Sequence, residues 1–153
     1  MKIKIEVEEG LKEDELILRC GSLNEEILSI QKKLSDLMNQ RQQLTVTRGD
    51  AEYYLVLDEI LFFETTESQM AVHTREHIYY SKYKLYELEE LLPGSFMRVS
   101  KSTIINTGKI RAIHKNITGA SEVEFARSNK KAFVSRSYYK ALATKLEEKR
   151  LSK

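Results

Sequence analysis

The feature that most constrains the fold is a succession of short apolar runs with a period of two, which begins at Leu44 and continues almost to the C-terminus. Apolar and polar residues that alternate over roughly four to eight positions are typical of a half-buried β-strand. Polar segments such as Arg48-Gly49-Asp50 separate the runs at short intervals, and short connections favour antiparallel pairing. The predicted strands cover residues 44–47, 53–57, 60–64, 70–74, 78–80, 96–99, 103–105, 110–113, 123–126 and 132–134. We therefore expect a mainly β domain over residues 44–150.

Two helices belong to the same domain. Leucines at helical spacing between positions 85 and 92 predict a short internal helix, which Pro93-Gly94 ends. A second helix is predicted over residues 137–150 at the end of the domain. Its narrow apolar stripe consists of Tyr138, Leu142 and Leu146.

Residues 1–43 carry a different pattern and are predicted to form a small strand–strand–helix extension. Apolar and charged residues alternate over positions 2–8, and a second short apolar run covers positions 16–19, so each is expected to be a strand. Cys20 adjoins the second run and is expected to be a small buried hydrophobic residue.

A helix is predicted to follow these two strands. Ser22 and Glu25 have the spacing of a capping box, and an apolar stripe continues to about Gln40. The stripe consists of Leu23, Ile27, Ile30, Leu34 and Leu37. It covers too few heptads to indicate a coiled coil by itself. Three roles stay open for the extension: dimerisation, binding of a partner protein, or packing on the domain.

The net charge of +2 hides an uneven distribution along the chain. Residues 1–45 carry −2, residues 46–94 carry −6, and residues 95–153 carry +10. A strongly basic C-terminal third is expected of a surface that binds a polyanion such as nucleic acid. A solvated basic face that complements the acidic middle of the chain is the alternative.

Membrane insertion and secretion are not expected. No stretch approaches the ~18 consecutive apolar residues that span a bilayer, and the N-terminus lacks the apolar block of a secretory signal. The single cysteine allows neither an internal disulfide nor a site made of several thiolates. We therefore expect a cytoplasmic protein.

Motifs of catalysis, metal binding and cofactor binding give no positive signal. His73-Thr74-Arg75-Glu76-His77 matches the inverted zinc-peptidase pattern, but the apolar runs on both sides predict strands instead of the helix which that pattern requires. In an extended chain the two imidazoles would stand ~13 Å apart, too far for one zinc ion. The chain has no Gly-rich phosphate loop and no nucleophile elbow. We predict no enzyme activity, no catalytic or metal-ligating residues, no cofactor and no small-molecule substrate.

Two segments of the basic third place cations and hydroxyl groups side by side. The first spans residues 98–103, and the second spans residues 134–140, where the last strand passes into the last helix. Arg and Lys suit guanine, Ser and Thr suit phosphates or bases, and a helix N-terminus adds N–H donors for phosphate. Solvated loops with ordinary cations are the alternative. The candidate DNA contacts here are Arg98, Ser100, Lys101, Ser102, Ser135, Arg136, Tyr139 and Lys140.

In order and spacing, four segments between Leu44 and Leu146 resemble the LytTR DNA-binding domain of bacterial response regulators. They are residues 58–64, 85–89, 96–106 and 134–136. The most specific stretch is F-x-R-x-x-[KR]-S-x-[IV]-[IV]-N, which residues 96–106 match. The resemblance implies an elongated fold of about ten short antiparallel strands, which inserts loops instead of a recognition helix into successive major grooves and bends the duplex.

The resemblance also implies three contact regions on this chain. They fall at Ser68 with Gln69, at Ser100 with Lys101, and at Arg136. Many family members carry His at the position of Ser100, and Thr103 replaces a common aromatic residue.

The N-terminal extension is too short for the receiver domain that usually precedes a LytTR domain. The chain therefore resembles the short stand-alone LytTR regulators, in which a membrane protein encoded nearby often acts as antagonist.

We predict a bacterial, sequence-specific regulator of transcription that binds double-stranded DNA as a dimer or on paired direct repeats of a promoter. The alternative is a non-enzymatic interaction module whose basic face binds RNA or an acidic protein.

Overall fold

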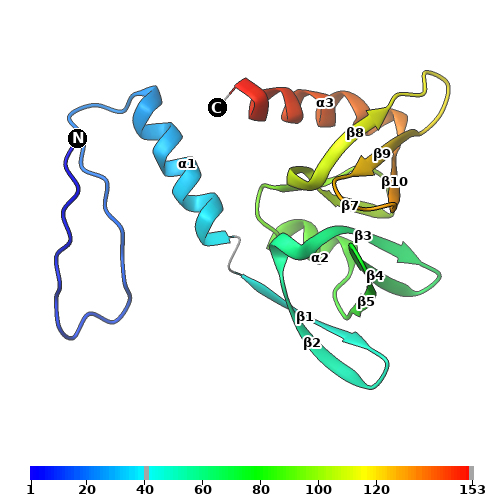
Figure 1. Ribbon diagram of the computed structural model, residues 1–153, viewed down its shortest axis with the longest axis horizontal. Helices are drawn as coiled ribbons and strands as arrows, with labels where there is room; N and C mark the ends of the chain where they lie inside the picture. The colour runs from blue at the N-terminus through cyan, green and yellow to red at the C-terminus, as the bar shows by residue number, and fades with distance from the viewer. Residues whose placement is uncertain (40–41, 152–153) are drawn as a thin grey trace.

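The computed structural model describes residues 1–39 and 42–151. Within these residues the chain forms ten strands in two antiparallel sheets, together with three α-helices (Figure 1). The prediction of a mainly β fold is thus confirmed, and each strand predicted after residue 43 is present with ends that differ by at most two residues.

The larger sheet contains seven strands in the order β2-β1-β5-β4-β3-β7-β6. Every neighbouring pair is antiparallel, as the short connections led us to expect. The strands are β1 (Gln43–Arg48), β2 (Ala51–Val56), β3 (Ile60–Thr66), β4 (Gln69–Thr74), β5 (Ile78–Ser81), β6 (Phe96–Arg98) and β7 (Thr103–Asn106).

The smaller sheet contains three strands in the order β10-β9-β8, and it lies beside the larger one in Figure 1. Its strands are β8 (Ile110–His114), β9 (Ser121–Phe125) and β10 (Lys131–Val134). Helix α2 (Leu85–Leu91) joins β5 to β6, and helix α3 (Arg136–Leu151) follows β10. Two single-turn 3₁₀ helices, η1 (Leu57–Glu59) and η2 (Thr107–Lys109), precede β3 and β8.

Strand β3 lies between two hydrophobic cores. All four residues from Ile60 to Phe63 are buried, which a continuous apolar run allows only when both faces of the strand are covered. A register irregularity between Ile60 and Phe62 interrupts the pairing with β4. A bulge of this kind lets the neighbours Leu61 and Phe62 face the same core, while Ile60 and Phe63 face the other.

The first core lies between the larger sheet and α2, and the second lies between the two sheets and α3. Leu88 of α2 packs with Phe63 and Phe96 in the first core. Leu142 of α3 is fully buried with Phe125 and Val134 in the second. Helix α3 therefore anchors the smaller sheet to the larger one, and its N-terminus is held at the end of β10.

Helix α1 (Glu25–Asn39) forms where the apolar stripe predicted a helix, but its cap differs from the prediction. The side-chain oxygen of Asn24 accepts a hydrogen bond from the backbone N–H of Ile27 at 3.0 Å. Asn24 therefore caps the helix, two residues after the predicted Ser22. The predicted C-terminal end at about Gln40 lies outside the described residues.

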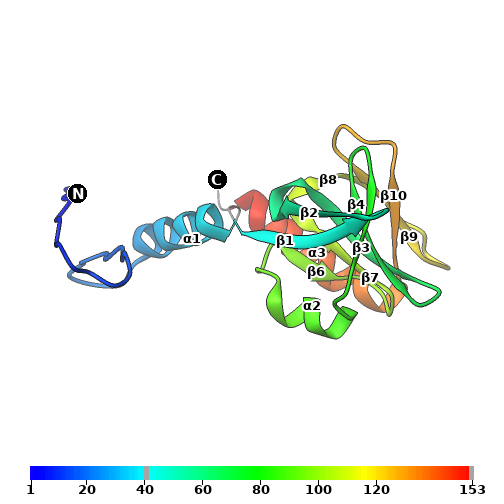
Figure 2. The same cartoon turned by 90° about the horizontal axis from the view of Figure 1, so that it is seen from below.

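The two strands predicted at positions 2–8 and 16–19 do not form. Residues 1–24 have no strand, and the alternating side chains Ile3, Ile5 and Val7 are between 85% and 94% exposed. Cys20 is exposed as well, so its predicted burial is also wrong. A strand requires a neighbouring edge for its backbone groups, and Figures 1 and 2 both show this segment lying apart from the two sheets.

Candidate nucleic-acid interface

The first two predicted contact regions lie at the same end of the larger sheet. Strands β3 and β4 are joined there by the two-residue turn Glu67-Ser68, and Thr66 pairs with Gln69 across it. The loop of residues 99–102 joins β6 to β7 at this end too. The backbone N–H of Thr65 donates a hydrogen bond to the carbonyl oxygen of Ser102 at 2.9 Å, which connects the two regions directly.

The third region, at the junction of β10 and α3, is bonded to the same loop. The backbone N–H of Ser135 donates to the carbonyl oxygen of Val99 at 2.9 Å. A chain of two backbone hydrogen bonds therefore connects all three regions that are far apart in the sequence. We call this end of the sheet, with residues 67–69, 99–102 and 135–140, the loop end.

Arg98 holds the 99–102 loop from within. Its Nε donates to the carbonyl oxygen of Ser100 at 3.0 Å, and its Nη2 donates to that of Lys101 at 2.8 Å. Its Nη1 forms an ion pair with Glu89 Oε2 of α2 at 2.9 Å. The planar guanidinium thus fixes two successive loop carbonyls and ties the loop to a helix. The guanidinium of Arg98, a predicted DNA contact, is therefore occupied by contacts within the protein.

The hydroxyl groups of the loop also order its backbone. Ser100 Oγ accepts a hydrogen bond from the backbone N–H of Ser102 at 3.2 Å and lies 3.5 Å from Ser102 Oγ. The backbone N–H of Val99 donates to the carbonyl oxygen of Thr103 at 3.0 Å, which closes the loop at its base. The side chain of Lys101, at the centre of the loop, is exposed.

At the third region, Ser135 precedes the first turn of α3. Its carbonyl oxygen accepts hydrogen bonds from the backbone N–H groups of Tyr138 and Tyr139, and its hydroxyl lies 3.3 Å from that of Ser137. Arg136 is the first residue of the helix and is exposed, and the first turn contains no acidic residue. The positive end of the helix dipole and the Arg136 guanidinium therefore both favour an anion here.

The remaining predicted contacts differ in exposure. Ser68, Gln69, Ser102 and Lys140 are exposed, whereas Ser100 and Ser135 are half-buried. Tyr139 packs against the second core, and Lys115 Nζ lies 5.0 Å from the centre of its ring. Lys115, in the loop between β8 and β9, is therefore a further cation near α3. It was not among the predicted contacts, because its only signal in the sequence is its place in the basic C-terminal third.

Many basic residues of the C-terminal third are paired elsewhere. Lys109 binds Asp58, Arg111 and His114 share Glu124, and Lys131 binds Glu122. The Glu124 pKa is lowered to about 2 by its hydrogen bonds with His114 and Arg111. Among the described residues, no carboxylate pairs with Lys101, Arg136 or Lys140. Three cations that can meet phosphates are therefore gathered at the loop end.

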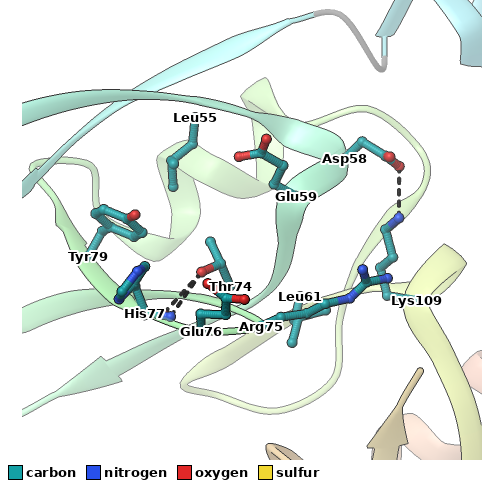
Figure 3. A pocket seen from close by; sticks show the side chains of 10 residues that line it. All are labelled: Leu55, Asp58, Glu59, Leu61, Thr74, Arg75, Glu76, His77, Tyr79 and Lys109. Carbon is teal, nitrogen blue, oxygen red and sulfur yellow. Dashed lines mark hydrogen bonds and ion pairs between the residues drawn. The ribbon is translucent and has the colours of Figure 1, made fainter. Parts of the chain in front are cut away.

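A hollow of about 330 Å³ lies at the opposite end of the larger sheet (Figure 3). Asp58, Glu59 and Glu76 line it beside Arg75 and Lys109, so its charges are mixed. The Lys109–Asp58 ion pair, at 3.1 Å, closes one side of it. This balance of charge distinguishes the hollow from the cationic loop end.

The two histidines of the zinc-peptidase pattern lie in different surroundings. His73 is on β4 and stacks on Phe62 with ring centroids 4.1 Å apart, whereas His77 lines the hollow and packs against Tyr79. The predicted strand–turn–strand geometry of this segment is confirmed. In the parts of the chain that the structure describes, no three His, Cys, Asp or Glu residues are grouped so that they could hold a metal ion.

His73 is the most strongly perturbed base of the domain. Burial lowers its pKa to about 4, and the neighbouring ammonium of Lys130 acts in the same direction. Lys130 Nζ donates to the carbonyl oxygen of His77 at 2.9 Å and lies 3.4 Å from His73 Nδ1. These contacts fix the smaller sheet's β9–β10 loop against the β4–β5 hairpin.

The model of the LytTr DNA-binding domain matches residues 50–147, which is more than half of the chain. This chain belongs to the LytTR family. The family is one of DNA-binding domains and not of enzymes. Residues 50–147 include all three regions of the loop end, so the LytTR domain carries the whole candidate interface.

Curated relatives match almost the full length of the LytTR chain. An uncharacterized HTH-type transcriptional regulator of Staphylococcus aureus (strain bovine RF122 / ET3-1) is 24% identical over 147 residues, covering 95% of this chain and 98% of the relative. A similarly described protein of S. aureus strain MRSA252 is 26% identical over 107 residues, covering 69% and 71%. The alignment with the first of these proteins therefore includes most of residues 1–43.

A solved structure supports the fold independently. A LytTr DNA-binding domain from Bacillus cereus superposes with a TM-score of 0.62 at 25% identity and covers 67% of this chain and 94% of its own.

The described residues contain no helix long and apolar enough to cross a membrane.

Proposed function

We propose that this protein is a sequence-specific regulator of transcription that binds double-stranded DNA through the loop end. The observation that carries the proposal is the pair of hydrogen bonds, Thr65 to Ser102 and Ser135 to Val99, which gathers the three regions on one side of the domain. Membership of the LytTR family and the names of the Staphylococcus relatives support DNA as the partner.

Loops, and not a recognition helix, are proposed to enter successive major grooves. Consecutive helices are absent from the described chain, since strands separate α1, α2 and α3, so a helix-turn-helix unit has no place there. The Glu67-Ser68 turn, the 99–102 loop and the start of α3 are the features that can reach a groove.

Each region has a distinct proposed role. Arg136 suits a bidentate contact with guanine, and Lys101 suits a phosphate or a guanine edge. Ser68, Gln69, Ser102 and Lys140 contribute further exposed contacts. Arg98, Ser100 and Ser135 are proposed to act through the shape of the loops, since their polar groups are engaged within the protein.

The setting of this activity is proposed from the same reasoning. A bacterial regulator of a promoter acts in the cytoplasm, and two copies of the chain, as a dimer or on paired direct repeats, would place one loop end on each half-site. Residues 1–43 are proposed as a regulatory or dimerisation extension of the domain at residues 44–150, with a membrane protein as a regulatory partner.

Binding-site selection from random duplexes, at physiological salt with excess non-specific competitor, tests the proposal. We expect an enriched motif with two half-sites about one helical turn apart. Arg136→Ala should cost ~1–3 kcal/mol on that motif and relax specificity at one base pair. Lys101→Ala should weaken binding as well. Arg75→Ala is the matched control, because Arg75 is an exposed cation at the opposite end of the sheet.

Two outcomes would contradict the proposal. Binding that only decays with salt, with no enriched motif, would make the basic third a general polyanion surface. Competition by structured RNA or heparin as strong as that by the selected duplex would point to RNA or an acidic protein as the partner.

Equal losses of affinity for Arg136→Ala on selected and random duplexes would restrict Arg136 to phosphate contact.

A further inference from the structure

The N-terminal segment of residues 2–8 has the features of a β-strand without a partner. Its apolar side chains Ile3, Ile5 and Val7 are 94%, 85% and 89% exposed. Its charged residues occupy the positions between them. Lys4 Nζ lies 2.8 Å from Glu6 Oε1, so these two side chains are on the same side of the segment. One face is therefore apolar and the other charged, as in a strand of an amphipathic sheet.

In the structure this segment lies apart from both sheets of its own chain. Figures 1 and 2 show residues 1–20 on the far side of α1 from both sheets. The chain reverses at Glu9 and Gly10, where Gly10 has a φ of 88°. Within the described residues, no strand pairing includes the segment. Exposed β-branched residues in an extended segment are a template for pairing with another chain.

The sequence of the segment is complementary to itself when it is read in the opposite direction. In an antiparallel pair centred on Ile5, Lys2 faces Glu8 of the second copy and Lys4 faces Glu6. Ile3 faces Val7, and Ile5 faces its own copy. Every cross-strand pair thus joins opposite charges or two apolar residues, which is the favourable combination on each face of a sheet.

We propose that residues 2–8 are a dimerisation strand whose partner is the same segment of a second copy of this chain. The pairing is isologous, as a two-fold axis through Ile5 requires. Six apolar side chains then lie on one face of the ribbon. A two-stranded ribbon is marginal in water by itself, so this face needs cover. The nearest exposed apolar side chains along the chain are Leu11, Leu16, Ile17, Leu18 and Leu23, and Leu28 and Leu37 of α1 lie further on.

This interface is separate from the proposed DNA contacts, because none of its residues lies in the LytTR domain at residues 50–147. It also differs from a coiled coil of α1, whose apolar stripe is short. Failure of the pairing would leave the proposed contacts at the loop end untouched.

Charge reversal in the full chain tests the pairing without DNA. The double variants Lys2→Glu/Lys4→Glu and Glu6→Lys/Glu8→Lys each make all four charges of the segment alike. We expect a dimeric native chain in sedimentation equilibrium, and for each variant alone a dimer dissociation constant raised at least about tenfold by like-charge repulsion. An equimolar mixture of the two variants should restore the dimer, since opposite charges then face each other again.

Cysteine cross-linking tests the register. In a Cys20→Ser background, Ile5→Cys should form an intermolecular disulfide readily, because directly opposed residues lie within the Cα distance that a disulfide spans. Ile3→Cys should cross-link in a mixture with Val7→Cys more completely than either does alone. A Leu11→Cys chain, with its thiol outside the paired segment, is the control.

Several results would overturn the proposal. A monomeric native chain would exclude the interface. It would favour pairing of residues 2–8 with residues 15–19 of the same chain instead. Dimers that persist unchanged in both charge variants would place the interface elsewhere, on α1 or on the exposed sheet edges β2 and β6. Variants that are monomeric alone and stay monomeric when mixed would exclude the antiparallel register.

Discussion

The backbone N–H of Ser135 donates a hydrogen bond of 2.9 Å to the carbonyl oxygen of Val99. This bond joins the start of α3 to the loop between β6 and β7, and so it sets the position of Arg136 relative to Lys101. Both side chains are exposed, but the main-chain segments that carry them are held next to each other. Recognition of bases at fixed positions on a duplex requires a rigid arrangement of this kind.

Arg98 is predicted to act by positioning the loop and not by meeting DNA. Arg98→Lys keeps the charge but cannot hold the carbonyl oxygens of Ser100 and Lys101 together. We expect affinity for the selected duplex to fall about tenfold, which corresponds to about 1.4 kcal/mol. The slope of log affinity against log salt should not change, whereas loss of one phosphate contact would reduce its magnitude by about 0.9.

Glu89→Gln is the control for that measurement. It removes the ion pair of Arg98 and leaves both carbonyl contacts in place, so we expect a smaller loss of affinity. A salt slope that falls in Arg98→Lys would show that Arg98 itself meets the duplex.

Glu67 is predicted to strain the turn between β3 and β4. Its φ of 52° is in the left-handed region, where a side chain costs roughly 1–2 kcal/mol relative to glycine. Glu67→Gly should therefore raise the free energy of unfolding by about 1 kcal/mol, measured by urea denaturation. Glu67→Gln removes the charge but keeps the side chain, so it should leave stability nearly unchanged. Equal stability of both variants would show that the turn tolerates a side chain without strain.

His73 is predicted to make the domain less stable in mild acid. Its pKa is lowered from 6.5 to about 4 in the folded protein, chiefly by burial and also by Lys130. Between these two values the unfolded chain binds a proton that the folded chain does not, so stability falls as the pH decreases from 6.5 to 4. The loss should reach about 2 kcal/mol, with the nearby Glu64 limiting it.

His73→Phe keeps the stacked ring on Phe62 and removes the titration. Urea denaturation of both proteins at several pH values in this window should show a smaller slope for the variant. Parallel curves would mean that His73 titrates alike in the folded and unfolded chains.

Asn106 is predicted to hold the end of β7 against the start of β3. It is 4% exposed, its Nδ2 donates to the carbonyl oxygen of Ile60 at 2.9 Å, and its Oδ1 accepts from the backbone N–H of Gly108 at 3.1 Å. Asn106→Ala removes both bonds and should cost about 2–3 kcal/mol of stability. Asn106→Asp retains the acceptor but loses the donor. It should cost more at pH 7, where a carboxylate would face a carbonyl oxygen. A loss below about 0.5 kcal/mol in both would contradict this role.

The strands after residue 43 could be predicted because their evidence is local. Apolar and polar side chains that alternate along six residues have one favourable backbone arrangement, and the Pro93-Gly94 pair ends a helix wherever the rest of the chain lies. The motif at residues 96–106 likewise identified the family before any contact was known. Arg98 shows the limit of that reasoning, since a motif residue of the right chemistry is engaged by Glu89 and two loop carbonyls, and no spacing rule reports such contacts.

Tertiary structure decided which elements became neighbours and which charges stayed free. The alternation at residues 2–8 is as regular as that of β1, yet only β1 is a strand here, because a strand needs a second backbone to satisfy its N–H and C=O groups. The same holds for the basic third, where Lys109 and Arg111 are paired with carboxylates, whereas Lys101 and Arg136 have no carboxylate partner among the described residues. By itself the sequence determined the type and order of the elements after residue 43, since periodicity is a property of consecutive residues. Pairing, burial and free charge depend on residues distant in the chain, and only the folded structure brings these together.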